Sequence, residues 1–151
     1  MRKLNLTALF CMMLASCGTT TPSALNGTWA ANLQASNGSD VFGFTSNLMQ
    51  TKGTSVAVSN FALGFPNGSP NSCLSGQTSE NATFSSTGNS NGVQTGQFAM
   101  TITDAQGNVL TIQGNLMSNS TNESITGGWT LTGSSGCNTN GTFSMNPLPK
   151  V

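Results

Sequence analysis

A two-residue alternation of apolar and polar side chains is the feature that most constrains how this chain can fold. Phe98, Met100 and Ile102 alternate with Gln97, Ala99, Thr101 and Thr103. The same pattern returns in Leu110, Ile112 and Leu116. Because successive side chains of a β-strand point to opposite faces, the alternation predicts strands with one buried face and one exposed face.

Turn-forming clusters of Gly, Asn and Ser interrupt the alternation about every ten residues. Residues 104–108, Asp-Ala-Gln-Gly-Asn, lie between the two clearest runs and predict a hairpin connection with turn residues at positive φ. No window carries a helical stripe with caps. The pattern therefore predicts an all-β protein, an antiparallel meander of about eight short strands. Such a sheet must close into a small barrel or fold into a sandwich to bury its apolar face.

The alternation is weaker in the first half of the chain. In the segment 54–65 it places Ala57, Phe61, Leu63 and Phe65 on one side and Val56 and Val58 on the other. The segment 66–92 is rich in Pro, Asn and Ser, and we expect it to be an irregular excursion.

Charged side chains are scarce, which narrows the possible functions. The 151 residues include 4 Lys+Arg, 4 Asp+Glu and no His, whereas Ser, Thr, Asn and Gly supply 77. So few cations exclude nucleic-acid binding through a basic surface, and the lack of His excludes His-based catalysis and His-ligated metal. No carboxylate pair or activated Ser is marked in the sequence, so we expect neither an enzyme nor a cofactor.

The first seventeen residues carry an export signal. Arg2 and Lys3 precede an apolar stretch at 4–14, which has 11 residues against the roughly 20 needed to cross a bilayer, as in a signal peptide. The stretch ends in Leu14-Ala15-Ser16-Cys17, which resembles the lipobox of bacterial lipoproteins. The other interpretation is an ordinary secretory signal that contains a Cys.

The lipoprotein resemblance implies cleavage before Cys17 and acylation of its sulfur. It divides the chain into a signal peptide at 1–16, a lipidated Cys and flexible tether at 17–24, and a single β-domain at 25–151. Two or more acyl chains would anchor the protein stably to a membrane. Gly18, where an Asp can retain lipoproteins at the inner membrane, favours the outer membrane. The mature chain would carry a net charge of −2, from Lys52, Lys150, Asp40, Glu80, Asp104 and Glu123.

Two cysteines remain in the mature chain, Cys73 and Cys137. In an exported protein they predict a disulfide, which would close a loop of 65 residues. A metal site is the alternative, but it lacks His, a CxxC pair and clustered carboxylates.

The residues Asn26-Gly27-Thr28-Trp29 resemble the Gly-x-Trp that opens the first strand of lipocalin- and avidin-like barrels. The resemblance implies that Trp29 closes one end of a barrel, and Gly127-Gly128-Trp129 repeats the same cadence. The Arg that packs over this Trp in the family has no counterpart, because the mature chain contains no Arg. Trp29 and Trp129 are therefore candidates for a barrel end or ligand cavity, with ordinary core residues as the other interpretation.

These observations favour a lipid-anchored protein of the bacterial cell envelope whose β-domain acts as a structural or interaction module. One alternative is a lipocalin-like carrier of a small apolar ligand, and another is an inhibitor of an envelope enzyme. The expected partners are the membrane, through the lipid, and either an apolar small molecule or an envelope protein. Nucleic acid is not an expected partner.

Overall fold

A computed structural model describes residues 25–51, 53–65, 73–74, 76–134 and 136–149. The expected signal peptide, the acylated Cys17 and the tether at 17–24 lie outside these residues. Every regular element among them is a β-strand, in agreement with the all-β fold predicted from the alternation. The strands are β1 (Gly27–Ala35), β2 (Asp40–Gln50), β3 (Ser55–Gly64), β4 (Thr78–Ser90), β5 (Val93–Asp104), β6 (Val109–Ser118), β7 (Glu123–Thr132) and β8 (Thr139–Pro147).

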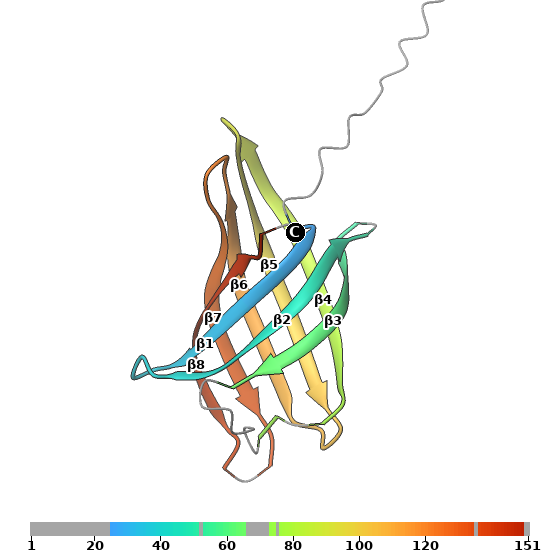
Figure 1. Ribbon diagram of the computed structural model, residues 1–151, viewed down its shortest axis with the longest axis vertical. Coiled ribbons are helices and arrows are strands. Elements are labelled where there is room, and N and C mark those ends of the chain that lie inside the picture. The colour runs from blue at the N-terminus through green and yellow to red at the C-terminus, as the bar shows by residue number, and fades with distance from the viewer. Residues whose placement is uncertain (1–24, 52, 66–72, 75, 135, 150–151) are drawn as a thin grey trace, which may run out of the picture.

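The eight strands form a closed barrel in which each strand pairs antiparallel with its neighbour in the chain (Figure 1). The barrel closes where β1 pairs with β8, from Trp29 opposite Pro147 to Ala35 opposite Gly141. The expected meander is confirmed, and the structure decides for a barrel rather than a sandwich. We call the end where β1 begins and β8 finishes the N-terminal end, and the opposite end, which holds Cys73 and Cys137, the disulfide end.

Side chains fill the barrel interior in layers. One layer crosses the sheet through Phe84, Phe98, Gly114, Gly127 and Phe143, which lie opposite one another on successive strands. A Cβ added to Gly114 would lie 2.7 Å from Cζ of Phe143, so this position must stay small to admit the ring. Gly114 thus leaves the space that the ring of Phe143 occupies, whereas a Cβ on Gly127 would meet the backbone of β6.

Composition suggests an irregular excursion at 66–92, and this is wrong for residues 78–90, while 66–72 and 75 lie outside the described residues. Residues 78–90 form β4, which pairs with β5 along its length, from Thr78 opposite Asp104 to Ser90 opposite Val93. Only Ala82 and Phe84 of this strand are buried, and polar residues occupy its other positions, so the apolar alternation is too short to be read from the sequence.

The faces assigned to β3 are also partly wrong. Val56 is buried and Val58 packs against the core, whereas Ala57 is exposed. Asn60 adopts a φ of 52°, and the register against β2 shifts at this point. The irregularity turns Phe61 and Leu63 back toward the core, so the residues before and after it do not follow one alternation.

Strands β3 and β4 form the weakest joint of the barrel. Among the described residues only two pairs join them, Ser55 with Thr83 and Val56 with Ala82. The seven other ladders each contain at least seven pairs. Figure 1 shows β3 running away from β4 toward the disulfide end.

Candidate functional site

Both tryptophans are core residues whose indole donors are already bonded. Trp29 lies near the N-terminal end, and its Nε1 donates to the carbonyl of Leu25 at 2.8 Å. Trp129 lies farther from that end, and its Nε1 donates to the carbonyls of Gln34 and Thr142, both at 3.0 Å. The position of Trp29 agrees with a barrel-end role, but neither indole offers a free donor to a ligand.

The buried interior is almost wholly apolar. Its largest side chains are fully buried, among them Trp29, Trp129, Phe42, Phe44, Phe84 and Phe98. Phe42 packs edge-on against Trp129, with ring centroids 5.7 Å apart. One interior hydroxyl, that of Ser46, is 1% exposed and has no hydrogen-bond partner. The described core is thus packed by its own side chains.

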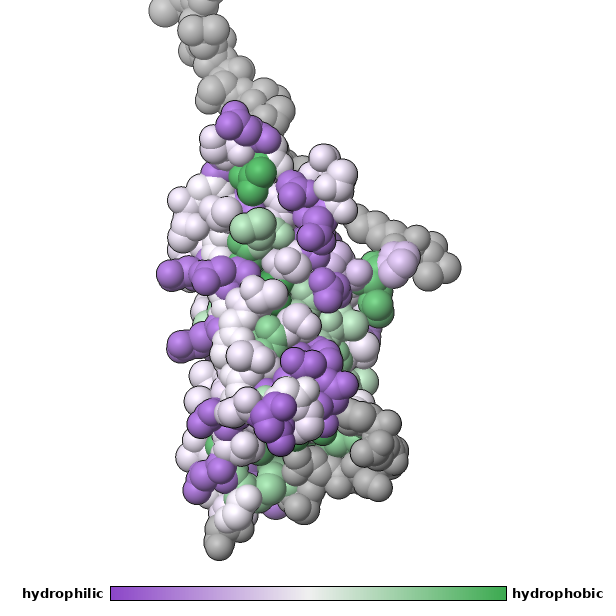
Figure 2. All heavy atoms as spheres, turned by 90° about the vertical axis from the view of Figure 1, so that its left-hand side faces the viewer, coloured by the Kyte–Doolittle hydropathy of each residue, from purple (hydrophilic) through white to green (hydrophobic). Residues whose placement is uncertain are grey.

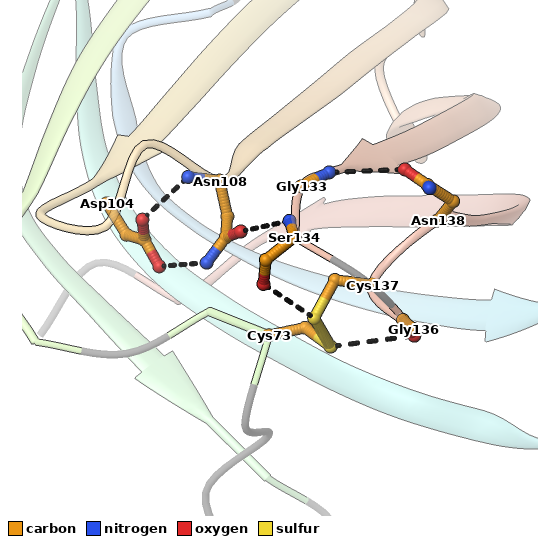
Figure 3. Close-up of a disulfide and its surroundings, with 8 residues drawn as sticks. All are labelled: Cys73, Asp104, Asn108, Gly133, Ser134, Gly136, Cys137 and Asn138. Atoms are coloured by element: carbon orange, nitrogen blue, oxygen red, sulfur yellow. Dashed lines mark hydrogen bonds between the residues drawn. A yellow bond between two sulfur atoms is a disulfide. The ribbon is translucent and has the colours of Figure 1, made fainter.

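The disulfide end is held by a covalent bond. Cys73 and Cys137 form a disulfide with their Cα atoms 5.3 Å apart, which is the pairing expected from the sequence (Figure 3). Leu74, the residue after Cys73, is fully buried in the same core as the barrel side chains. The disulfide therefore joins the chain between β3 and β4 to the β7–β8 connection.

A hydrogen-bonded network lies beside the disulfide. Asp104 is 5% exposed, and its Oδ1 accepts bonds from the backbone N–H groups of Gln106 at 2.9 Å and Asn108 at 2.8 Å. Its Oδ2 accepts a bond from Nδ2 of Asn108 at 2.9 Å, and Oδ1 of Asn108 accepts one from the backbone of Ser134 at 3.1 Å. Figure 3 shows this chain of contacts running from the β5–β6 turn to the β7–β8 loop. The expected hairpin at 104–108 is present, with Gly107 at φ 82°, but Asp104 is a buried structural residue and not a solvated turn residue.

The other carboxylates are dispersed and each has a polar neighbour. Asp40 begins β2, and the side-chain amides of Asn32 and Gln34 donate to it, which holds its pKa below the usual value. Glu80 accepts a bond from the hydroxyl of Thr78, and Glu123 accepts one from Ser118 at 3.0 Å. Within the described residues no three His, Cys, Asp or Glu side chains gather as they would around a metal ion.

The outer wall contains a polar hollow that sequence reasoning missed. It has a volume of about 530 Å³ and lies over β4, β5 and β6, with Gln97, Gln113 and Asn115 in its lining. We call it the amide hollow after these three residues. No hydrogen bond joins their side-chain amides to another described residue, and no charged residue lines the hollow. It is completed by Thr54, Thr83, Phe84, Ser85, Phe98, Ala99, Gly114 and Gly127.

A second hollow of about 350 Å³ adjoins the first on the outer wall and shares Gln113 with it. Thr111, Thr130 and Gly128 line it on β6 and β7. The sequence shows these residues only as the polar half of each alternation. Their convergence depends on the register between β6 and β7, which composition does not reveal.

Comparison with known proteins gives no relative from which a role could be transferred. No family model matches the chain, and no curated protein or solved structure shows significant similarity to it. In the part of the chain that the structure describes, no helix is long and apolar enough to cross a membrane.

Proposed function

We propose that the protein is a lipid-anchored component of the bacterial cell envelope whose barrel acts as an interaction module. The observation that carries the anchor is the sequence Leu14-Ala15-Ser16-Cys17, which follows an apolar stretch too short to span a bilayer. Acylation of Cys17 would hold the barrel at a membrane surface, and Gly18 favours the outer membrane as that surface.

The packed interior favours a module over a carrier of an apolar ligand. A carrier needs a cavity whose walls are exposed to the ligand, but the largest inward side chains are fully buried against one another. Both indole N–H groups already donate hydrogen bonds to backbone carbonyls. Contacts with a partner therefore belong on the outer wall.

The amide hollow is the part of the outer wall best suited to such a contact. Three side-chain amides without hydrogen-bond partners among the described residues can each donate and accept such bonds, and they lie together in a concave surface. The lining carries no charge, so an ionic partner would lose its hydration without gaining a counter-ion. We propose that the module recognises an uncharged polar surface of an envelope partner through this hollow.

The anchor and the contact site are tested separately. Cys17→Ser should stop processing and release the protein from membranes, and unchanged membrane retention would contradict the anchor. For the contact site, crosslinking in cells of the native host would compare the wild type with a Gln97→Ala, Gln113→Ala, Asn115→Ala triple variant. The matched control is Asn146→Ala, an exposed amide on β8 outside the hollow.

A stoichiometric crosslinked partner that the triple variant loses and the control keeps would support the module. If that partner is an envelope enzyme, the inhibitor alternative gains the same support. Retention of the partner by the triple variant would show that the hollow is not the contact site. A native mass spectrum with a bound lipid or pigment would favour the carrier instead.

A further inference from the structure

The exposed large apolar side chains of the described residues lie at one end of the barrel. They are Met49 and Met117, each 57% exposed, and Leu148, which is 42% exposed. Met49 is the last residue but one of β2, Met117 is the last but one of β6, and Leu148 follows β8. All three positions belong to the N-terminal end, where β1 begins.

Their arrangement around the barrel suits a flat surface better than a protein groove. In a closed ring of eight strands, β2 and β6 lie on opposite sides, and β8 lies between them. A partner bound to one side of the wall would cover one of these side chains and leave another in water. A surface that lies across the whole end can contact all three.

The rest of the outer wall is more polar than the N-terminal end that carries these three apolar side chains. Figure 2 shows a face on which most residues are hydrophilic or of intermediate hydropathy. Strongly hydrophobic residues form only small separate patches on it. At the disulfide end, outward positions such as Thr103 and Thr132 carry hydroxyls instead of large apolar groups.

Negative charge is concentrated away from the N-terminal end. Asp40 begins β2 and Asp104 finishes β5, both at the disulfide end, and Glu80 is the third residue of β4, which starts there. Among the described carboxylates only Glu123 lies at the N-terminal end, where it accepts a hydrogen bond from Ser118. Because ionised carboxylates lose hydration in a lipid headgroup layer, this distribution favours the N-terminal end as the side that meets lipid.

The proposed anchor enters at this same end. Leu25 lies eight positions after Cys17, and a fully extended chain covers at most about 3.6 Å per position, so the span is at most about 29 Å. A ten-residue strand is about 33 Å long, so the tether alone would still let the barrel turn. The three apolar side chains supply the interaction that selects one orientation.

We infer that the N-terminal end of the barrel rests on the bilayer surface, with Met49, Met117 and Leu148 in the headgroup region and the disulfide end pointing away. This inference rests on the proposed lipid anchor and adds the orientation of the barrel. Amphipathic helices that lie on a membrane enter its interface by about 5–10 Å, and entry to a similar depth would cover side chains at the rim.

Methionine oxidation on the lipidated protein tests the orientation. The full chain, matured in a bacterial host, would be reconstituted in vesicles of phosphatidylethanolamine and phosphatidylglycerol and treated with chloramine T, a water-soluble oxidant. Mass spectrometry would then follow sulfoxide formation at each Met. Thr132→Met and Thr139→Met provide two separate exposed reporters at the disulfide end, and the buried Met100 and Met145 control for unfolding.

Co-flotation with the vesicles, with oxidation of Met49 and Met117 about fivefold slower than of the disulfide-end reporters, would support the inference. Co-flotation with equal rates at both ends would overturn the orientation and leave the anchor standing. Failure to float would overturn the anchor and the orientation together. A lipase would also be used to remove the acyl chains and release the protein. If Met49 and Met117 are still oxidised slowly after release, a protein contact protects them, and the inference is overturned.

Discussion

Gly141 lies directly opposite Trp129 in the β7–β8 ladder, and the indole occupies the space that a side chain at position 141 would need. A Cβ at this position would lie 2.9 Å from Nε1 of Trp129 and 1.8 Å from the carbonyl oxygen of Gln34. The same Nε1 donates to that carbonyl at 3.0 Å. The glycine therefore sets the position of a buried ring and the closure of the barrel between β8 and β1.

Gly141→Ala should consequently lower the free energy of unfolding by about 2–3 kcal/mol, because backbone must move to admit one methyl group. Urea denaturation followed by tryptophan fluorescence measures the change. Gly128→Ala is the matched control, since its Cβ would lie 3.6 Å from the nearest atom, the carbonyl oxygen of Gly141. Equal losses in the two variants would show that the close approach at Gly141 has no special weight.

Ser46→Ala should leave stability unchanged or raise it by up to about 1 kcal/mol, because the buried hydroxyl gave up water without gaining a protein partner. Thermal melting of the purified protein detects the difference. Thr45→Ala, at the exposed neighbouring position, should have little effect. A marked destabilisation by Ser46→Ala would reveal a partner for this hydroxyl, such as a bound water molecule.

Loss of the disulfide should lower stability by about 4 kcal/mol in the chain-entropy treatment, because Cys73 and Cys137 are 64 residues apart. The double variant Cys73→Ser, Cys137→Ser avoids a leftover free thiol. Chemical denaturation with and without a reductant gives two independent measurements, and reduction should have no effect on the variant. If the wild type is equally stable in both conditions, the bond contributes little.

Asp104→Asn should destabilise the protein by about 2 kcal/mol, because the new amide group would face N–H donors where the carboxylate accepts three bonds. Asp40→Asn offers the comparison at an exposed position. Hydrogen exchange should show the loss concentrated in the β5–β6 turn and around Ser134, which Asn108 holds. Uniform destabilisation of the barrel would contradict a local network.

The contribution of Asp40 to stability should depend on pH in the acid range. Hydrogen bonds from Asn32, and then from Gln34, lower the pKa of Asp40, so the folded state favours the ionised form. This contribution is fully present above the unfolded pKa, about 3.9, and is lost as the pH falls through the lower folded value. The stability difference between wild type and Asp40→Asn should therefore shrink below about pH 4. A difference that grows on acidification would contradict the lowered pKa of Asp40.

The second half of the barrel could be predicted from the sequence because its alternation is long. In β5, β6 and β7 most inward residues are large and apolar, so strand and face follow from the pattern. The glycines of these strands interrupt the alternation without shifting it. In β4 only two residues are buried and apolar, and in β3 the positive φ of Asn60 interrupts the period. Those two strands depend on pairing with their neighbours, which a local pattern does not contain.

The disulfide could be predicted by elimination, since the proposed processing at Cys17 would leave only Cys73 and Cys137 besides that residue. The burial of Asp104 could not be predicted, because a carboxylate in a turn can equally well be exposed to solvent. The amide hollow could not be predicted either, because it forms only when Gln97 and Asn115 pair across β5 and β6. Such convergence is a property of register and not of composition.

The short ladder between β3 and β4 gives the barrel a preferred place to open. Breaking its two residue pairs would leave the seven longer ladders intact, so the product is a curled eight-stranded sheet that runs from β4 through β8 and β1 to β3. The first partial unfolding of this protein therefore uncurls the sheet instead of removing a strand. Two free strand edges become available at that moment, so spontaneous exchange of strands between molecules would begin at this joint.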